Sequence, residues 1–389
     1  MKPVFSAGNR ITLLETGSGY FPALIAAIDG AQVEVHLESY IYADDATSRS
    51  VTQALVRAAQ RGVSVHVMVD GFGSPDFLSA PGYALIAAGV QVLVYRPEVA
   101  RLRLRRHRLR RLHRKVAMID GRIAFIGGIN IIEDVVAPEM TAPRLDYAIA
   151  VEGPLLATIH RAAHHLWRLV RWANFRRRVA EGATASPQVQ PAGEIDAAFV
   201  VRDNLRHRRD IEEAYLDAIE AAQNEVVLAS AYFLPGRRIR RALIDAAARG
   251  VRVVVLLQGR VEYVLQHYAT QALYGSLIAG GVAIHEYRPS FLHAKVAVVD
   301  GHWATVGSSN IDPFSLLMAR EANVIVRDTG FAAELRASLE RAITNDGVEI
   351  RADDLRKRSL LTRAACWLAY SAVRIAVGIA GYRSGDYRG

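Results

Sequence analysis

The chain has 389 residues, of which 51% are hydrophobic, so it holds enough apolar material for two domains of ordinary size. Its formal net charge of +9 indicates an anionic partner, either nucleic acid or an anionic membrane surface, and does not decide between them. One cysteine, Cys366, excludes an intramolecular disulfide and a cysteine-based metal site, and fits a reducing compartment.

The N-terminus and the hydropathy pattern indicate whether the protein is expected to cross a membrane. The first residues, MKPVFSAGNRITLLETG, lack the long apolar core of a signal peptide. No stretch of about 18 or more uncharged apolar residues occurs in the chain. We therefore expect a protein that stays on the cytoplasmic side of the membrane without spanning it.

The first half of the chain predicts alternating helices and strands. A helix and a strand are predicted in PALIAAIDGAQVEVHLESYIY, and a second pair in ALVRAAQRGVSVHVMVDG, where Gly62 is typical of a helix C-cap. A short helix and a strand follow in LIAAGVQVLVYRP. Two apolar strands joined by a turn at Asp120-Gly121 are then predicted in HRKVAMIDGRIAFIGGIN.

A basic insert precedes the last of these segments. His113 follows Pro97 by sixteen residues, whereas His293 follows Pro289 by four. The segment 98–112, EVARLRLRRHRLRRL, carries seven arginines interleaved with leucines. This pattern is typical of a segment that binds anionic headgroups while its leucines enter the membrane interface. The alternative is a solvated, arginine-rich loop.

The second half repeats the same order of elements. The four matching segments are YLDAIEAAQNEVVLASAYFL, ALIDAAARGVRVVVLLQG, LIAGGVAIHEYRP and HAKVAVVDGHWATVGSSN. Gly250 stands where Gly62 does, and Asp300-Gly301 repeats the Asp-Gly turn. The repeat is far longer than a solenoid unit, so it indicates domain duplication.

We predict an α/β fold of two duplicated domains with mixed β-sheets, packed about a pseudo-two-fold axis with the active site at their interface. The domains comprise residues 1–180 and 195–345. The linker is 181–194, which is rich in Ala, Gly, Pro and Ser. Residues 346–389 have no counterpart in the first half and form a basic, amphipathic C-terminal extension.

Two further segments combine arginines with apolar and aromatic residues. Residues 160–178 hold six arginines and are compatible with a helix, and residues 360–382 are apolar but interrupted by Arg363 and Arg374. Neither segment spans a membrane comfortably, and both have the composition of an interfacial helix. For the C-terminal segment, the alternative is a buried helix that caps the protein.

Each half carries one His-x-Lys-x4-Asp motif. The predicted catalytic set is therefore His113, Lys115, Asp120, His293, Lys295 and Asp300. Residues two apart in a strand share a face, so His and Lys of each motif project together, whereas the Asp has the opposite parity. We interpret the Asp of each motif as mainly structural. Two of only four lysines in the chain occupy the motif positions.

This residue set fits phosphodiester chemistry. Such a displacement needs a nucleophile, an acid for the leaving alkoxide, and positive charge near oxygens that gain negative charge. One motif supplies part of the set, and two motifs brought together supply two imidazoles and two ammonium groups. We therefore expect a single active site shared by both halves, with no metal and no cofactor.

Residues after each motif complete the predicted site. Three polar side chains near glycines are predicted to bind substrate phosphate: Asn130, Ser308 and Asn310. Each half then returns to an apolar strand opened by a carboxylate. We expect Asp146 to accept a hydrogen bond from His113, and Glu321 from His293, fixing each tautomer. The alternatives are turn residues for the asparagines and salt bridges at strand starts for the carboxylates.

With these motifs in hand, the chain resembles the phospholipase D superfamily, and within it the bacterial cardiolipin synthases of the B type. The resemblance runs from about residue 7 to beyond 345. It rests on LESYIYADD, GFGSPD, HRKVAMIDGRIAFIGGIN, LDYAIAVEGP, AYFLPG and HAKVAVVDGHWATVGSSNIDPFSL. It implies a metal-independent, two-step reaction through a covalent phosphohistidine, in which a phosphatidyl group moves from one phosphatidylglycerol to another to give cardiolipin and glycerol.

The resemblance also assigns roles to residues. It implies that His113 is the nucleophile and that His293 is the acid and then the base, an assignment that is open to reversal. Lysines and asparagines of the two motifs would bind phosphate. One departure is Gly128, which stands where the family often has Ser, as Ser308 does in the second half.

We therefore expect a phosphatidyltransferase that acts on anionic phospholipid at the cytoplasmic face of the bacterial cell membrane, as a peripheral protein that does not bind nucleic acid. The basic insert favours lipid. The motif itself does not decide whether water or an alcohol attacks the intermediate, so a hydrolytic phospholipase D or a nuclease is the alternative. A catalytically inactive binding protein is disfavoured because both His-Lys pairs are present.

Overall fold

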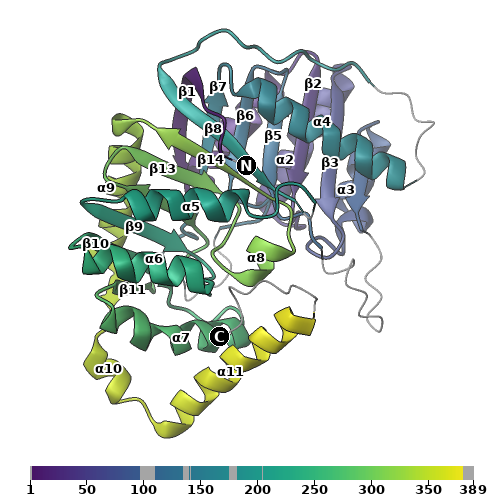
Figure 1. Cartoon of the computed structure of the whole chain (residues 1–389). Coiled ribbons are helices and arrows are strands. Elements are labelled where there is room, and N and C mark those ends of the chain that lie inside the picture. The colour runs from purple at the N-terminus through teal and green to yellow at the C-terminus, as the bar shows by residue number, and fades with distance from the viewer. Residues whose placement is uncertain are drawn as a thin grey trace.

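The computed structural model describes residues 2–96, 110–134, 140, 142–174, 182–203 and 205–379. Most of the predicted basic insert (98–109), the end of the 160–178 segment and the end of the 360–382 segment lie outside these residues. Figure 1 shows strands in two neighbouring groups with helices over them, and the C-terminal helices below the second group.

The first half begins with a strand and ends with a long helix. Its elements are β1 (Ser6–Glu15), α1 (Thr16–Asp29), β2 (Glu34–Ser39), α2 (Ala46–Gln60), β3 (Ser64–Asp70), the 3₁₀ helix η1 (Phe77–Ser79), α3 (Pro81–Ala87), β4 (Gln91–Tyr95), β5 (Lys115–Ile119), β6 (Ile123–Gly127), β7 (Tyr147–Glu152) and α4 (Leu156–Ala173).

The second half repeats this order and adds C-terminal elements. They are β8 (Ile195–Arg202), α5 (Asp210–Ala221), β9 (Glu225–Ser230), α6 (Arg237–Ala248), β10 (Arg252–Gln258), α7 (Val264–Ala279), β11 (Ala283–Tyr287), β12 (Lys295–Val299), β13 (Trp303–Gly307), α8 (Pro313–Leu317), β14 (Glu321–Arg327), α9 (Thr329–Asp346), β15 (Gly347–Glu349), α10 (Ala352–Arg356) and α11 (Leu360–Ile379).

The strand order is the same in both halves. It is β4-β3-β2-β5-β6-β7-β1 in the first half and β11-β10-β9-β12-β13-β14-β8 in the second, with β15 beyond β11. In each half the first three strands are parallel and the others antiparallel. The predicted duplicated α/β fold with mixed sheets is therefore confirmed. The sequence did not predict that β1 pairs with β8, which joins the two sheets into one.

The predicted Asp-Gly turns connect β5 to β6 and β12 to β13. The φ angles are +52° and +60° at Asp120 and Gly121, and +49° and +64° at Asp300 and Gly301. Two successive positive φ values define a type I′ turn, whose twist matches that of a two-residue hairpin. This turn chemistry therefore sets the register of both hairpins that begin with the motif residues.

Buried side chains hold the sheets together on both faces. Helices α1 and α2 cover the outer face of the first sheet, where Leu24 and Leu55 are fully buried. On the inner face, β6 and β7 lie against β13 and β14, and Ile149 and Val306 belong to one shared core. Each such side chain contributes about 1.5–3 kcal/mol through burial. The strands are apolar on both faces because both are covered.

Candidate active site

Backbone hydrogen bonds join the two halves where the motifs begin. The amide of His113 donates to the carbonyl of Arg320 over 3.0 Å, and the amide of His293 donates to the carbonyl of Leu145 over 2.8 Å. In both cases the acceptor directly precedes the carboxylate that was predicted to orient a histidine. Each motif histidine therefore lies beside the carboxylate-bearing strand of the opposite half.

A polar side chain at the end of a parallel strand holds the residue before each histidine. Asp70, which ends β3, accepts from the amide of Leu112 over 2.8 Å. Gln258, which ends β10, accepts from the amide of Leu292 over 3.0 Å. Both acceptors are buried. The carboxyl ends of the parallel strands thus position the histidines, although sequence reasoning assigned neither residue a role.

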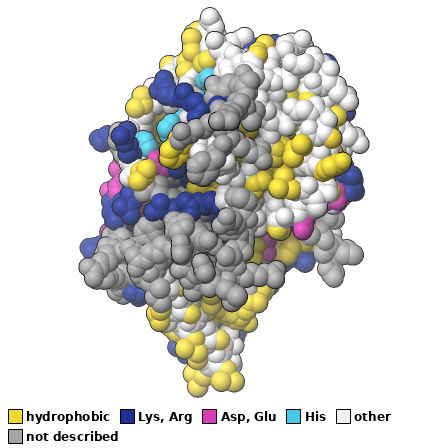
Figure 2. Space-filling model, turned by 90° about the vertical axis from the view of Figure 1, so that its right-hand side faces the viewer, with side chains coloured by type: hydrophobic (Ala, Val, Ile, Leu, Met, Phe, Trp, Pro, Cys, Tyr) yellow, Lys and Arg dark blue, Asp and Glu magenta, His cyan; other side chains and the backbone are white. Residues whose placement is uncertain are grey.

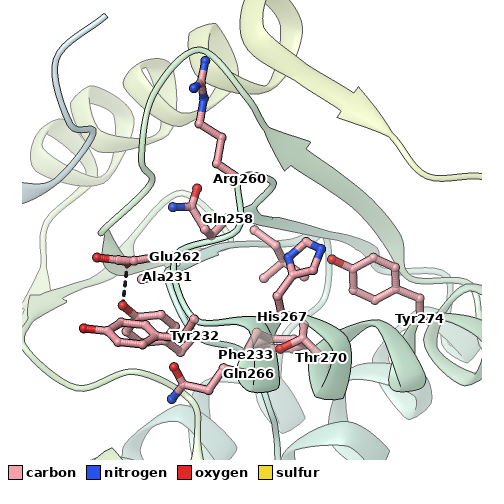
Figure 3. Close-up of a pocket in the computed structure, with 12 residues that line it drawn as sticks. Ala231, Tyr232, Phe233, Gln258, Arg260, Glu262, Gln266, His267, Thr270 and Tyr274 are labelled. Carbon is pink, nitrogen blue, oxygen red and sulfur yellow. Dashed lines mark hydrogen bonds between the residues drawn. The ribbon is translucent and has the colours of Figure 1, made fainter. Parts of the chain in front are cut away.

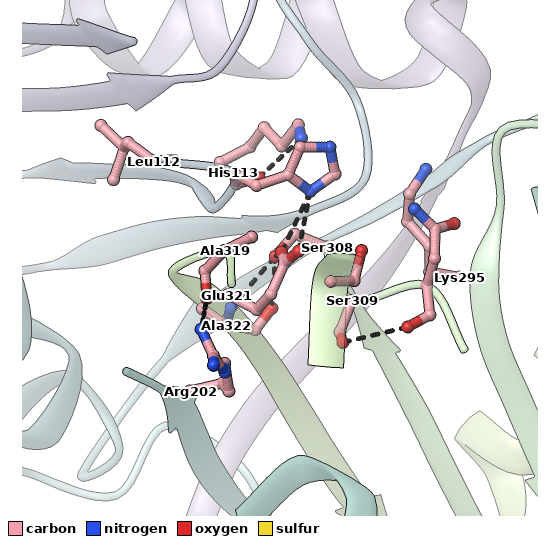
Figure 4. A network of polar contacts seen from close by, with 12 residues as sticks. Leu112, His113, Arg202, Lys295, Ser308, Ser309, Ala319, Glu321 and Ala322 are labelled. Atoms are coloured by element: carbon pink, nitrogen blue, oxygen red, sulfur yellow. Dashed lines mark hydrogen bonds and ion pairs between the residues drawn. The ribbon is translucent and has the colours of Figure 1, made fainter. Parts of the chain in front are cut away.

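Each histidine pairs with a carboxylate through Nδ1. His113 Nδ1 lies 3.0 and 3.1 Å from the two carboxylate oxygens of Glu321 (Figure 4). His293 Nδ1 lies 2.6 Å from Oδ2 of Asp146. Such a contact holds the imidazole in one orientation and leaves Nε2 to face a substrate.

The pairing predicted from the sequence was wrong. Asp146 was expected to orient His113 and Glu321 to orient His293, and the structure exchanges the partners. The reason is the backbone contact between halves, which places each carboxylate next to the opposite motif. The two carboxylates are correctly identified as neighbours of the histidines, but each acts across the interface.

The motif lysines are buried, and each contacts the histidine of its own motif. Lys115 Nζ donates to the carbonyl of His113 over 2.6 Å. Lys295 Nζ donates to the carbonyl of His293, and it lies 2.8 Å from Nδ1 of that residue and 3.9 Å from Asp146. The exposed fractions are 3% for Lys115 and 1% for Lys295, so both ammonium groups are almost free of bulk water.

Burial and mutual repulsion shift the pKa values of these groups. Burial, together with the charge of Lys295, lowers the pKa of Lys115 to about 7. Burial lowers the pKa of Lys295 to about 8, although Asp146 opposes that change. Burial also raises the pKa of Asp146 to about 6 and lowers the pKa of both histidines. Near pH 7 the imidazoles are therefore neutral.

Ser308 supports a carboxylate. Its hydroxyl donates to Glu321 Oε2 over 2.5 Å and is fully buried. In this structure its proton is directed at the carboxylate that holds His113, and phosphate binding by Ser308 stays a prediction. At the equivalent Gly128, an added Cβ would lie 2.2 Å from Asp146 Oδ1. The carboxylate of Asp146 occupies the space that a side chain would need.

Asn130 and Asn310 are buried at equivalent positions. Asn130 Oδ1 accepts from the amide of Ile41 over 3.1 Å, and Asn310 Oδ1 accepts from the amide of Tyr232 over 3.4 Å. These contacts use the amide oxygens, so the NH₂ groups remain as the donors for a ligand. Phosphate binding by the two asparagines stays a prediction.

Asp120 and Asp300 lie far from the histidines. Asp120 accepts from the amides of residues 32–34 at 2.8 Å, and Asp300 accepts from those of residues 223–225 at 2.8–2.9 Å. The lysine of each motif begins its strand and the aspartate directly follows the end of that strand. At 3.3 Å per residue the two residues are therefore about 16 Å apart. Their inclusion in the catalytic set is corrected, and the structural interpretation is confirmed: each carboxylate ties its hairpin to the start of β2 or β9.

Sequence reasoning missed two residues of the site, one beside His113 and one that supports the segment before Glu321. The ring of Tyr40 lies 4.8 Å from the imidazole, and Lys115 Nζ lies 5.4 Å from the same ring. Arg202, which is buried at the end of β8, donates to the carbonyl of Ala319 and so holds the segment before Glu321 (Figure 4). Tyr40 could have been found from its position directly after β2, because the equivalent position of the second half, after β9, holds Ala231.

A pocket opens beside His293 in the second half. Ala231, Tyr232 and Gln258 lie at the ends of β9 and β10, and Glu262 and Gln266 project from the segment that leads into α7 and from α7 itself (Figure 3). The hydroxyl of Tyr232 donates to Glu262 over 2.6 Å. Because Gln258 also holds the residue before His293, the pocket lies next to the motif.

Comparisons with known proteins agree with this geometry. The family model "Cardiolipin synthase, PLD-like domain" matches residues 24–162 and 215–343. Cardiolipin synthase B of Salmonella typhi is 41% identical over 374 residues, which cover 96% of this chain and 90% of that protein. Cardiolipin synthase B of Escherichia coli strain K12 is 40% identical over the same lengths.

Two solved structures share the fold. The phosphatidylserine synthase of Haemophilus influenzae aligns with a TM-score of 0.70 at 12% identity, covering 97% of this chain and 96% of that one. The polyphosphate kinase of Porphyromonas gingivalis aligns with a TM-score of 0.56 at 14% identity, covering 95% of this chain and 53% of that one. At these identities the similarity concerns the fold alone.

Proposed function

This chain belongs to the family of cardiolipin synthases with phospholipase D-like domains, and we propose that it transfers a phosphatidyl group from one phosphatidylglycerol to another, giving cardiolipin and glycerol. It is a phosphatidyltransferase that acts on phospholipid. The observation that carries the proposal is the pair of imidazoles, each held through Nδ1 by a carboxylate of the opposite half, above two buried lysines.

In the first step, Nε2 of His113 attacks the phosphorus of one phosphatidylglycerol. The bond from phosphorus to the oxygen of the headgroup glycerol breaks, and His293 gives that oxygen a proton. The lysines stabilise the charge that builds on the phosphoryl oxygens. Burial keeps His293 neutral in the free protein, and the bound anionic phosphate favours its protonated form.

In the second step, His293 takes a proton from a headgroup hydroxyl of the second phosphatidylglycerol. The resulting oxygen attacks the phosphorus, and the bond to His113 breaks. Glu321 stabilises the positive charge that His113 carries while it is phosphorylated. We assign Asn130 and Asn310 to the phosphoryl oxygens, because each amide is buried and already fixed through its oxygen.

We propose that a substrate headgroup reaches the rim of the pocket near His293, because the pocket volume of about 20 Å³ holds little more than a water molecule. Glu262 and Gln266 offer acceptors and donors that suit glycerol hydroxyls (Figure 3). We keep the proposed division into domains 1–180 and 195–345, linker 181–194 and extension 346–389. It is supported by the end of α4 at Ala173 and the start of β8 at Ile195.

The C-terminal helix α11 supports membrane contact. Its residues Ala369, Val373 and Val377 are buried in the core that includes α7. Its other side exposes large apolar side chains, with exposed fractions of 83% for Leu361 and 72% for Leu368. Hydrophobic side chains also gather at the lower end of the molecule in Figure 2. Helix α11 is thus both docked on the protein and open to an apolar surface.

Residues 360–377 of α11 are long and apolar enough to cross a membrane by length and composition alone, with 17% of this stretch buried by the protein. This finding corrects the expectation that the chain contains no such stretch. We propose peripheral binding at the cytoplasmic face, because α11 is docked on α7 and carries Arg363 and Arg374. Arginines flanking exposed leucines are typical of helices that lie on anionic bilayers.

Product analysis tests the reaction. Purified full-length protein is incubated with phosphatidylglycerol vesicles and, separately, with DNA, and the products are separated and identified. We expect cardiolipin and an equal amount of glycerol. Phosphatidic acid as the main product would identify a hydrolase, and release of nucleotides from DNA with no lipid turnover would identify a nuclease. Either result would overturn the proposal.

Vesicle flotation tests the membrane surface separately. We expect the protein to float with phosphatidylglycerol vesicles and not with phosphatidylcholine vesicles. Leu361→Glu and Leu368→Glu should weaken flotation, because each places a charge in the proposed contact. Tyr83→Glu, at a position 71% exposed in the first half, is the matched control. Equal flotation of all three variants would contradict a role for α11.

A further inference from the structure

A cluster of histidines and one carboxylate lies between the first sheet and α4, outside the active site. Glu34 opens β2 and His66 lies on β3, with exposed fractions of 2% and 5%. His160 and His164 lie one helical turn apart on α4, which crosses these strands in Figure 1. Nitrogens four residues apart on a helix face the same way, as in helical zinc motifs.

Four atoms of this cluster are buried and make no hydrogen bond to the described residues. They are Glu34 Oε1, His66 Nδ1, His160 Nε2 and His164 Nε2. Buried polar atoms are rarely left in that state, because desolvation without a partner costs about 1–3 kcal/mol each in protein variants. Four such atoms in one place suit a shared partner, and a cation can bind the carboxylate oxygen together with the lone pairs of neutral imidazole nitrogens.

The spacing of these atoms fits a small metal ion. Glu34 Oε1 lies 3.2 Å from His164 Nε2 and 3.4 Å from His66 Nδ1. The ligand atoms of Glu34, His160 and His164 all lie within 4.8 Å of one another. Bonds of 2.0–2.1 Å in a tetrahedral zinc site place neighbouring ligand atoms about 3.3 Å apart. His66 is outside that group of three and, of its members, approaches only Glu34, so its ring must move toward the other two histidines to become the fourth ligand.

The surroundings resemble the outer shell of a metal site. The second oxygen of Glu34 accepts from the backbone amide of Ala185 over 2.9 Å, in the segment that joins the halves. Trp167 packs 4.8 Å from the ring of His66 and closes one side. Such contacts orient ligands and exclude water.

In the second half, arginines balance the charge of the glutamate that is equivalent to Glu34. Glu225 opens β9 as Glu34 opens β2, and it pairs with Arg336 and with Arg252. Val254 stands on β10 where His66 stands on β3. Among the side chains that the structure describes, the partners of Glu34 are imidazoles. Glu34 is thus not held by a guanidinium as Glu225 is, and a bound cation would balance its charge.

We propose that Glu34, His66, His160 and His164 bind one divalent transition metal ion, with Zn²⁺ as the best match to three imidazoles and one carboxylate. Four protein ligands close the coordination shell, so the ion is structural. It fastens α4 and the connecting segment near Ala185 to β2 and β3. The site is separate from the phosphodiester chemistry, since Glu34 and the Tyr40 end of β2 are roughly 20 Å apart along the strand.

Metal content and affinity test the site. The full-length chain is prepared without a polyhistidine tag, stripped with a chelator, and titrated with ZnCl₂ in a calorimeter. We expect one zinc per chain and, at about 100 times the Kd, an increase of about 3 °C in Tm. Co²⁺ in place of Zn²⁺ should give the visible absorption bands of a tetrahedral site.

Variants separate ligation from folding. His160→Ala and His164→Ala lie on a half-buried helix surface and should weaken zinc binding by at least about 100-fold. His165→Ala, an exposed histidine of the same helix, is the matched control and should bind as the natural chain does. Equal Tm values of all metal-free proteins show that the fold is intact. Absence of zinc binding by the natural chain, or an equal loss in His165→Ala, would overturn the proposal, whatever the activity on lipid.

Discussion

His113 and His293 occupy equivalent positions two residues before β5 and β12, but different groups hold them. Glu321 contacts His113 with both oxygens and is itself held by Ser308. Asp146 contacts His293 with one oxygen and sits over Gly128, where no side chain competes. His113 is therefore held by a glutamate that a serine supports, and His293 is held by an aspartate that lies against a glycine.

The strand ends and aromatic neighbours differ in the same way. Asp70 holds the residue before His113 with a carboxylate, and Gln258 holds the residue before His293 with a neutral amide. Tyr40 packs on His113, whereas Ala231 leaves room for the pocket beside His293. Duplication thus explains why both imidazoles are present, and the substituted neighbours are what give them different roles in the proposed reaction.

The largest expected effect comes from removing either imidazole. We expect His113→Ala and His293→Ala each to lower kcat by at least about 10⁴-fold, because each acts as part of one unit. With a phosphodiester whose leaving group needs no proton, His293→Ala should still form a covalent adduct, and His113→Ala should not. Intact-protein mass spectrometry after acid-free quenching measures the adduct. An adduct in His113→Ala alone would reverse the two roles, and His165→Ala is the control.

The next effect concerns the lysines and pH. The positive charge of Lys115, whose pKa is lowered to about 7, is lost as pH rises through that value, and that of Lys295 is lost near 8. Asp146, whose pKa is raised to about 6, loses its negative charge as pH falls through 6. We expect a bell-shaped dependence of kcat on pH with its maximum between about 6 and 8.

Lysine variants check that interpretation. Lys115→Met should lower kcat by about 10²–10³-fold, the range seen when one transition-state donor is removed. Lys357→Met, at an exposed position of the C-terminal extension, is the control. A flat profile between pH 5 and 9 would show that the charges of the lysines and Asp146 do not limit turnover.

A smaller effect is expected from exchanging the groups that support the carboxylates. Gly128→Ser places a Cβ 2.2 Å from Asp146 Oδ1, so the carboxylate must move away from His293. We expect kcat to fall by about 10–100-fold, within the range for second-shell changes. Ser308→Ala removes one donor to Glu321 and should cost about tenfold or less. Gly275→Ser, where a Cβ meets open space, is the control for the added side chain.

The smallest effect on activity is expected at the motif aspartates. Asp120→Asn and Asp300→Asn each weaken charge-assisted bonds to three backbone amides, which should lower the free energy of unfolding by about 1–3 kcal/mol. Asp120 is the more buried, so its variant should lose more. Urea unfolding measures the loss, with the exposed Asp217→Asn as control. A large fall in kcat of the folded protein would contradict the structural role.

Backbone hydrogen bonding of Asp300 adds a dependence of stability on pH. Burial alone would raise the pKa of this carboxyl, but the amides of residues 223–225 lower it overall. A lowered pKa in the folded state means that the contribution to stability is present above the unfolded value and is lost as pH falls through the folded value. The Asp300→Asn variant should therefore differ less from the natural chain in acid.

The amino-acid sequence determined the elements that depend on local patterns. Apolar runs, the glycines after helices and the Asp-Gly turns predicted the strands, the helices and both hairpins, since these follow from side-chain periodicity and backbone sterics. The spacing of His113 and Lys115, and of their counterparts, predicted which side chains share a face. The duplication predicted a shared site because each copy alone is incomplete.

Tertiary structure alone decided which residues meet across the halves. The pairing of His113 with Glu321 and of His293 with Asp146 depends on backbone bonds between segments about 150–200 residues apart, which leave no local pattern. The same holds for Ser308, whose hydroxyl donates to Glu321. Likewise, Glu34 and His164 contact each other only because α4 packs over β2. Sequence spacing limits which groups share a strand face, and packing between elements decides what each group contacts.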